Sequence, residues 1–260
     1  MQNLRDLAGN PAYFEINREE RNVAALLYHL LLSKKNLSVF LDDLGYKNEA
    51  LEKVELYYEF AYVRDLWKKL PNDNDKKRDF IVDSLVVNDV EHLIPKTGVK
   101  EFNTFFGATR AESEKHIVSP ANWSILGMSD MLKENQSLFE AVCMLKWGFN
   151  VKPDLVVVLP NNRAICIEAK WDSTEGTYKG NDLFKNVKQL HVQKYVMEEI
   201  LNYDQVDYVY LTKSTTRGNA KNEIDLVLNR HWNQIFQKLD YSDSLPFAQK
   251  WIERIINLEK

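Results

Sequence analysis

Two short motifs that carry charged residues stand at the two ends of one largely apolar stretch of the sequence. Pro153 and Asp154 precede the run LVVVL, and Glu168, Ala169 and Lys170 close the run AICIEAK. Two carboxylates and an ammonium are costly to bury unless something compensates their charge. A divalent cation would do so, because Mg²⁺ is typically bound by one or two carboxylates together with water and substrate phosphate. The motifs therefore point to metal-assisted phosphodiester hydrolysis, in which the lysine adds positive charge to the transition state.

The elements that must position these groups are two strands, 155–159 and 164–170, joined by the turn sequence PNNR. Side chains two apart on a strand share a face, so Glu168 and Lys170 are neighbours by geometry. Asp154 returns close to them if the turn closes an antiparallel hairpin. It shares their face only if the loop holds an odd number of residues or one strand carries a bulge.

Further elements around the hairpin are expected from apolar periodicity and end signals. A helix capped by Ser129 and ended by Gly148 should precede it, and a helix over about 182–203 and a strand over 206–212 should follow. Two more helices are expected near the end of the chain, at 223–239 and 247–258. The order of helix, strands, helix and strand predicts an α/β core with a sheet layered between helices.

The N-terminal part of the chain is expected to be helical. Asn17 and Glu20 have the spacing of a capping box that opens the first helix. Gly45 is of the residue type that commonly ends a helix. A second long helix is expected from 48 to 70, followed by an exposed turn over 71–79.

The glycines and proline within 96–128 mark the expected boundary, which divides the chain into a helical region, 1–110, and an α/β domain, 111–260.

Two cysteines with no Cys-x-x-Cys pair exclude a zinc knuckle and a disulfide framework. No apolar run approaches the ~18 residues of a membrane span, and no signal peptide opens the chain, so we expect a cytoplasmic protein. A net charge of −4 excludes a general polycation.

The pair Pro153-Asp154, followed 14 residues after the aspartate by Glu168-Ala169-Lys170, resembles the signature of the PD-(D/E)XK nuclease superfamily. The resemblance covers about residues 129–212 and implies a restriction-endonuclease-like mixed sheet flanked by helices. It implies that Asp154, Glu168 and Lys170 are catalytic, with the two carboxylates as ligands of Mg²⁺ or alternatively Mn²⁺. Only GFNVK separates the preceding helix from the motif, so the first strand of the usual core is very short, missing or supplied from elsewhere.

The resemblance also implies supporting residues. Members of the superfamily often carry a glutamate on the helix before the motif strands, and Glu140 is the matching candidate for a further metal ligand. They often carry Gln or Tyr on the helix after the lysine strand, where Gln189 and Gln193 resemble that element without its usual spacing.

Two segments without acidic residues, 183–194 and 213–221, flank the expected site. Their residues Lys185, Lys188 and Lys213 are candidates for phosphate contacts, although either segment taken alone is typical of a solvated face. We therefore expect a Mg²⁺-dependent nuclease acting on nucleic acid, with DNA favoured over RNA.

The nuclease resemblance further implies a prokaryotic restriction, defence, mobile-element or repair setting. The N-terminal helices would serve as a homodimer surface, a partner surface or a target-binding element. Two alternatives stay open. One is a nuclease-like subunit that no longer cuts and instead binds nucleic acid or supports assembly. The other is a helical interaction protein in which the hairpin is incidental and its charges form a surface ion pair.

Overall fold

A computed structural model describes residues 19–85, 87, 90–108, 114–171, 176–180, 185–213 and 227–257. The chain forms two compact units. The first unit combines residues 1–60, 153–174 and 205–260, and the second combines 61–152 and 175–204. This division differs from the expected boundary at residue 110, because the first helices and the motif hairpin belong to the same unit.

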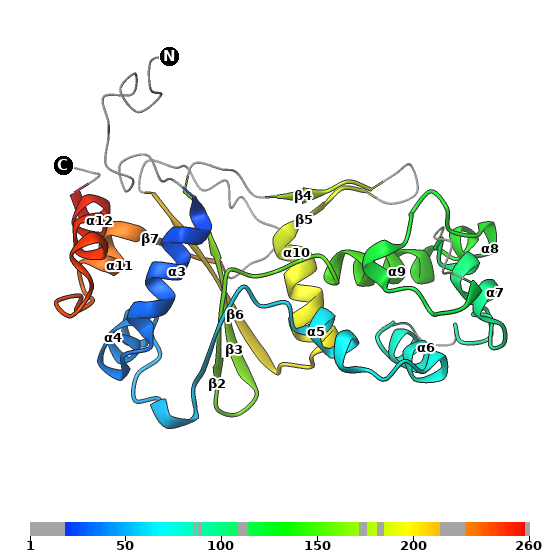
Figure 1. Cartoon of the computed structure of the whole chain (residues 1–260), viewed down its shortest axis with the longest axis horizontal. Coiled ribbons are helices and arrows are strands. Elements are labelled where there is room, and N and C mark those ends of the chain that lie inside the picture. The colour runs from blue at the N-terminus through cyan, green and yellow to red at the C-terminus, as the bar shows by residue number, and fades with distance from the viewer. Residues whose placement is uncertain are drawn as a thin grey trace, which may run out of the picture. The chain divides into compact units, whose positions relative to one another are not determined.

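A five-stranded mixed sheet forms the centre of the first unit (Figure 1). Its order is β1 (Glu55–Tyr58), β2 (Leu155–Leu159), β3 (Arg163–Ala169), β6 (Gln205–Thr212) and β7 (Val227–His231). Strands β1, β2 and β3 are antiparallel neighbours, whereas β6 and β7 continue the sheet in parallel with β3. The α/β class and the mixed sheet expected from the sequence are thereby confirmed.

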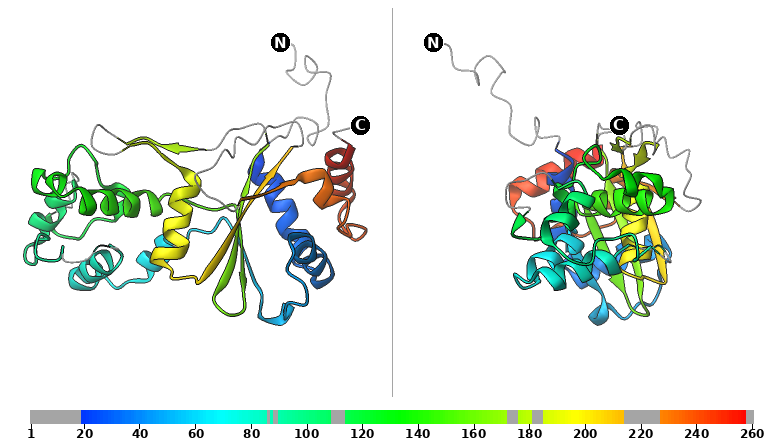
Figure 2. Two further views of the ribbon diagram at one scale, coloured as in Figure 1. Left: turned by 180° about the vertical axis from the view of Figure 1, so that it is seen from behind. Right: turned by 90° about the vertical axis from the view of Figure 1, so that its right-hand side faces the viewer.

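Four helices cover one face of this sheet, as two views of the ribbon show (Figures 1 and 2). They are α3 (Glu20–Leu31), α4 (Lys34–Leu44), α11 (Trp232–Phe236) and α12 (Pro246–Asn257). Alternate strand residues such as Leu155, Ile167 and Leu211 enter the core that these helices share. The other face also carries buried residues, among them Val156 and Cys166. Burial on both faces accounts for the nearly continuous apolar runs of the central strands.

The N-terminal region differs from the expected run of helices. Gly45 ends α4 in the left-handed conformation (φ 98°), as its type predicted. The prediction of one long helix over 48–70 is wrong, because this segment forms a short 3₁₀ turn (η1, Leu51–Lys53), strand β1 and helix α5 (Tyr62–Lys69). Pairing of β1 with β2 overrides the helical spacing.

Two other expected elements are corrected. The segment expected as a turn at 71–79 contains most of α6 (Asn74–Asp83), because Asp73 caps that helix by accepting from the N–H groups of Asp75 and Lys76. The helix expected at 223–239 is replaced, within its described part, by strand β7 and the short α11. Parallel pairing with β6 fixes β7 as a strand.

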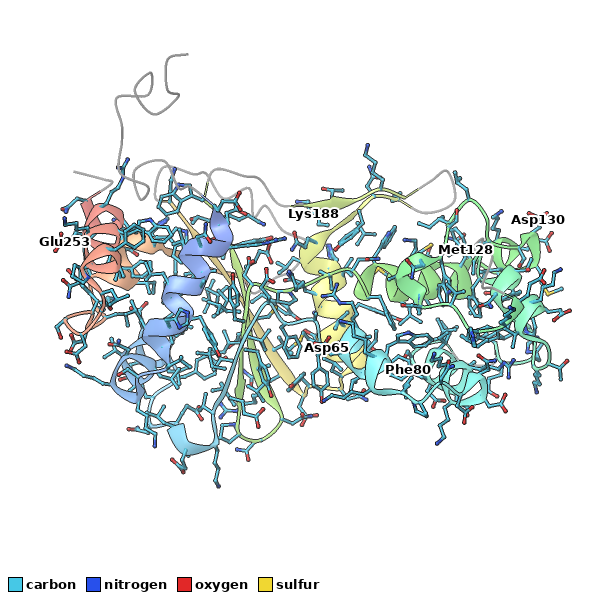
Figure 3. All side chains as sticks on the ribbon, viewed as in Figure 1. Asp65, Phe80, Met128, Asp130, Lys188 and Glu253 are labelled. Atoms are coloured by element: carbon cyan, nitrogen blue, oxygen red, sulfur yellow. The ribbon has the colours of Figure 1, made fainter. Side chains whose placement is uncertain are left out.

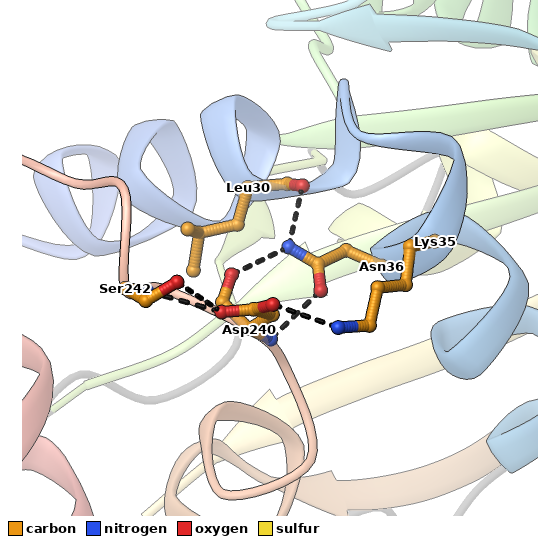
Figure 4. Close-up of polar contacts among 5 residues, drawn as sticks. All are labelled: Leu30, Lys35, Asn36, Asp240 and Ser242. Atoms are coloured by element: carbon orange, nitrogen blue, oxygen red, sulfur yellow. Dashed lines mark hydrogen bonds and ion pairs between the residues drawn. The ribbon is translucent and has the colours of Figure 1, made fainter.

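A buried asparagine ties the N-terminal helices to the segment after α11 (Figure 4). The Asn36 side chain donates to the carbonyls of Leu30 (3.0 Å) and Asp240 (2.8 Å), and it accepts from the Asp240 N–H (2.8 Å). Asp240 also accepts from Lys35 and Ser242. Both N–H groups and the oxygen of this buried amide are therefore hydrogen-bonded, and the two bonds to Asp240 join distant segments of one unit.

The second unit is mainly helical. Besides α5 and α6 it contains α7 (Val99–Phe105), the 3₁₀ turn η3 (Pro120–Asn122), α8 (Asp130–Glu134), α9 (Gln136–Gly148), α10 (Gln189–Lys194) with a following π-helical turn η4 (Tyr195–Ile200), and the ribbon β4 (Thr177–Tyr178) and β5 (Val187–Lys188). Its core includes Met128 and, at its border, Phe80 (Figure 3). The predicted cap at Ser129 and end at Gly148 are confirmed, although Asn135 divides the segment into two helices.

Within the described ranges, no helix combines the length and the apolar character that crossing a membrane requires.

Candidate functional site

The motif hairpin places Asp154 directly across from Glu168. Leu155 pairs with Ile167 and Leu159 pairs with Arg163, so three residues, Pro160 to Asn162, make the turn. Asn161 and Asn162 adopt positive φ (61° and 55°), which asparagine tolerates better than most residues. This odd loop length meets the condition set by the sequence pattern. Asp154 and Glu168 therefore lie on one face of the sheet, opposite the face covered by the helices.

Glu168 and Lys170 form a buried ion pair on that face. Lys170 Nζ donates to Glu168 Oε1 at 2.6 Å, and the two residues are only 9% and 3% exposed. Burial alone would lower the pKa of Lys170, but the charge and hydrogen bond of Glu168, together with the charges of Glu20 and Asp154, outweigh it, so its pKa is raised. The lysine therefore stays charged beside the carboxylates.

Asp154 is the third member of this group. One of its oxygens accepts a hydrogen bond from the Ala169 N–H at 2.8 Å. Burial, followed by the negative charge of Glu168, raises the pKa of Asp154 to about 7, although that hydrogen bond and Lys170 oppose the shift. Asp154 is partly buried and Glu168 is buried, and each carboxylate disfavours the ionised form of the other. A cation bound between them would offset this repulsion.

Glu20, at the start of α3, also reaches this group. Its Oε1 accepts from the Trp171 N–H at 2.9 Å, and its Oε2 lies 3.8 Å from Lys170 Nζ. The sequence pattern indicated Glu20 only as a member of a capping box. In the structure Glu19 is the N-cap and makes no side-chain cap, while Asn17 lies outside the described residues. The signal that could have identified Glu20 is an acid at a helix start that precedes all the strands.

The backbone around Lys170 is held on both sides. Its N–H donates to the Leu211 carbonyl at 2.8 Å, which extends the pairing of β3 with β6. Its carbonyl accepts from Trp232 Nε1 at 3.0 Å. Trp232 is almost fully buried, so a rigid core residue fixes where the lysine leaves the sheet.

The donor set suits a hard cation such as Mg²⁺. Each carboxylate offers two oxygens, and the contacts with Ala169 and Lys170 each use one of them. Among the described residues, no group of three or more His, Cys, Asp and Glu side chains is arranged to hold a metal ion by itself. Asp154 and Glu168 would thus share a cation with water and substrate phosphate, as Mg²⁺ sites commonly do.

The remaining predicted residues lie elsewhere in the chain. Glu140 belongs to α9 of the second unit, where its carboxylate accepts from Gln136. Gln189 and Gln193 lie on α10 of the same unit, and Gln193 is fully buried. The geometry described for Asp154 and Glu168 is that of the first unit alone, and these three residues of the second unit remain candidates.

The predicted basic residues differ in their surroundings. Lys185 is exposed, and Lys188 lies on β5 (Figure 3); both belong to the second unit. Lys213 follows β6 in the first unit, and its ammonium lies 4.6 Å from the centre of the Trp171 ring. The rest of the second basic segment, including Arg217 and Lys221, lies outside the described residues.

Comparison of the chain with protein-family models, curated proteins and solved structures gives no match.

Proposed function

We propose that this protein is a metal-dependent nuclease that hydrolyses phosphodiester bonds of DNA. The observation that carries the proposal is the placement of Asp154, Glu168 and Lys170 on one sheet face, where β2 begins and β3 ends. A surface ion pair would not need a second carboxylate directly opposite the first, nor burial of the lysine.

The arrangement of the first unit also supports the proposed resemblance to PD-(D/E)XK nucleases. The strand that was lacking before Pro153 is supplied by β1, which pairs with β2 although the second unit's residues separate them in the chain. Helix α3 precedes β1 and carries Glu20 next to Lys170. Glu20 therefore matches the helix glutamate of that superfamily better than Glu140 does.

The side chains have distinct tasks in the proposed reaction. Asp154 and Glu168 would hold Mg²⁺ or Mn²⁺, and a bound ion would supply a polarised water and positive charge at the phosphoryl oxygens. Lys170 stays protonated beside Glu168, so it can orient the attacking water and stabilise the charge that builds on the phosphate. Glu20 holds the Trp171 backbone and faces the same ammonium, so it would help to position Lys170.

Positively charged residues outside this group would neutralise phosphates of the substrate. Lys185, Lys188 and Lys213 remain our candidates, and each replacement should lower the dependence of binding on salt by about one unit of slope. A homodimer through the N-terminal helices also remains a prediction. The apolar sides of α3 and α4 pack into the sheet core, so such a dimer would use their outer sides.

The test is cleavage of circular and linear DNA and RNA with Mg²⁺, Mn²⁺ or EDTA, together with calorimetric titration of the metal. Asp154→Ala and Glu168→Ala should each lose activity and metal affinity. Lys170→Ala should keep the metal while turnover falls by ~10² or more, the scale of one electrostatic stabiliser. Cleavage by Lys170→Ala at the wild-type rate would refute the proposal.

The same measurements distinguish the alternative functions. Wild-type protein that binds DNA but cuts neither DNA nor RNA with either metal would indicate a nuclease-like binding subunit. Protein that binds neither metal nor nucleic acid would indicate an interaction protein with an incidental hairpin.

A further inference from the structure

The carboxyl ends of three parallel strands lie at the sheet edge that holds the candidate site. Strand β3 ends at Ala169, β6 at Thr212 and β7 at His231. In open α/β sheets, ligands bind outside the carboxyl ends of parallel strands. The edge therefore continues past the carboxylates toward β7, and Thr212 and His231 are the polar residues that it presents next.

The strand register places both residues on the same face as Glu168. Glu168 pairs with Tyr210, and Thr212 pairs with His231, so these side chains leave the sheet on one side. The residue before each belongs to the opposite face: Leu211 enters the helix-covered core, and Arg230 bonds to Asp43 of α4. Asp154, Glu168, Thr212 and His231 therefore form a polar row on one face of the sheet, opposite the face that the helices cover.

Thr212 and His231 also contact each other. The Thr212 hydroxyl lies 3.5 Å from His231 Nδ1, the outer limit of a hydrogen bond, and Thr212 is 4% exposed, whereas His231 is partly exposed. A buried hydroxyl can fix the ring of a neighbouring histidine and decide which nitrogen serves another partner. With Nδ1 engaged by Thr212, that nitrogen is Nε2.

The distance of His231 from the carboxylates indicates what it could bind. Adjacent strands lie about 4.8 Å apart, so β7 stands roughly 10 Å from β3 across β6. Lys170 Nζ is held at Glu168, so His231 is placed to contact a different phosphate from the one that Lys170 would reach. This spacing suits the next phosphate along an extended strand of nucleic acid.

We infer that His231, positioned by Thr212, forms a subsite for the phosphodiester next to the one that is cut. The inference rests on the proposed nuclease function and makes its substrate class narrower. The preferred substrate is then a strand with at least two consecutive phosphodiesters, not an isolated phosphodiester. Thr212 is a positioning residue in this arrangement, since it acts through the histidine.

The test uses trinucleotides, which contain two phosphodiesters. In one set both are normal, and in two others either the first or the second is replaced by an uncharged methylphosphonate, which leaves one bond to cut. For wild type, either replacement should lower kcat/KM about 10-fold, the scale of a hydrogen bond to a charged group, because the one bond left to cut then has no charged neighbour in the subsite. His231→Ala should lose about 10-fold on the normal trinucleotide and show no further loss with either methylphosphonate.

Variants of Thr212 and of His29, a histidine on another element, complete the design. Thr212→Val should reproduce the His231→Ala pattern in weaker form, and Thr212→Ser should restore wild-type behaviour because it keeps the hydroxyl. His29→Ala, on the exposed side of α3, should follow wild type on every substrate.

Independent losses from His231→Ala and the methylphosphonate, which multiply in the combination, would overturn the subsite. An equal loss by His231→Ala on all three substrates would do the same, because a structural defect does not depend on the adjoining phosphate. Failure of wild type to cut any nucleic acid is a separate result that removes the nuclease function and the subsite together.

Discussion

Lys170 Nζ lies 2.6 Å from Glu168 Oε1, and both side chains are buried on a sheet face that also carries Asp154. The lysine compensates part of the negative charge that Asp154, Glu168 and the nearby Glu20 bring together. One cation against three carboxylates leaves a local excess of negative charge. A divalent ion would reverse that excess, so the charge balance of this group should depend on metal.

The first prediction concerns the stability of the Lys170→Met variant. The change leaves Glu168 buried without its cation, so the metal-free protein should lose about 3 kcal/mol of its free energy of unfolding. Mg²⁺ should raise the melting temperature of the variant more than that of wild type, because it replaces the missing positive charge. Urea unfolding in EDTA and thermal unfolding over a Mg²⁺ series measure both effects.

The control for this prediction is Lys100→Met, which removes an exposed lysine paired with Glu114. An exposed pair contributes little, so this variant should unfold like wild type and respond to Mg²⁺ as wild type does. Equal Mg²⁺ responses of Lys170→Met and wild type would contradict the idea that a cation beside Glu168 replaces the charge of Lys170.

The second prediction is a pH dependence of stability in the metal-free protein. An unfolded aspartate has a pKa of about 3.9, whereas folding raises the pKa of Asp154 to about 7. Between these values the folded state holds more protons than the unfolded state. Stability should therefore fall as pH rises from about 4 to about 7, by roughly 4 kcal/mol at most, and then level off.

Asp154→Asn should remove this decline, because the amide does not ionise and its oxygen can still accept from the Ala169 N–H. Urea unfolding in EDTA at about pH 5 and about pH 8 tests the difference. The variant should be more stable than wild type at the higher pH. A wild-type slope that survives in Asp154→Asn would assign the titration to another group.

The third prediction concerns the buried clamp of Asn36 (Figure 4). Asn36→Leu keeps a similar volume but leaves the Leu30 carbonyl and both backbone groups of Asp240 without this partner. The free energy of unfolding should fall by about 3 kcal/mol in urea. Lys35→Ala is the matched control, since its ion pair with Asp240 is solvent-exposed and its loss should leave stability nearly unchanged. Equal stability of the two variants would contradict the clamp.

The sequence was most informative where a short segment determines its own structure. The alternation of Glu168 and Lys170, the turn that follows Leu159, and the ends at Gly45 and Gly148 depend on neighbouring residues only. The predicted hairpin therefore has the expected strands, and its loop length settles the face of Asp154 that the sequence pattern left open.

Features that depend on distant partners could not be predicted in the same way. The residues of β1 have spacings that also suit a helix, and only pairing with β2, far along the chain, makes them a strand. The sequence pattern indicates Glu140, close to the motif in sequence, as the candidate for a further metal ligand. Glu20 approaches Lys170 only because α3 packs across the sheet. The two compact units also differ from the expected division at residue 110, because the first unit is assembled from three separate segments.

The fourth prediction separates the two contacts of Glu20. Glu20→Gln keeps an oxygen that can accept from the Trp171 N–H but removes the negative charge beside Lys170. It should fold with nearly wild-type stability, while single-turnover cleavage of DNA in Mg²⁺ should slow by about 10-fold or more, because the lysine is no longer held by this charge. Glu20→Ala removes both contacts, so it should slow cleavage similarly and also lower the free energy of unfolding by about 1–3 kcal/mol.

Glu19→Gln is the control, because it changes the charge of the exposed neighbouring residue at the same helix start. Glu19→Gln should leave both cleavage and stability close to wild type. A change in either would show the effect of losing a negative charge at the helix start, apart from any contact with Lys170. If Glu20→Gln cleaves DNA as fast as wild type, Glu20 serves only to anchor α3 to the end of β3. If Glu20→Gln is instead as unstable as Glu20→Ala, its charge is needed for folding, because Lys170 would then depend on both Glu20 and Glu168 for its place in the sheet.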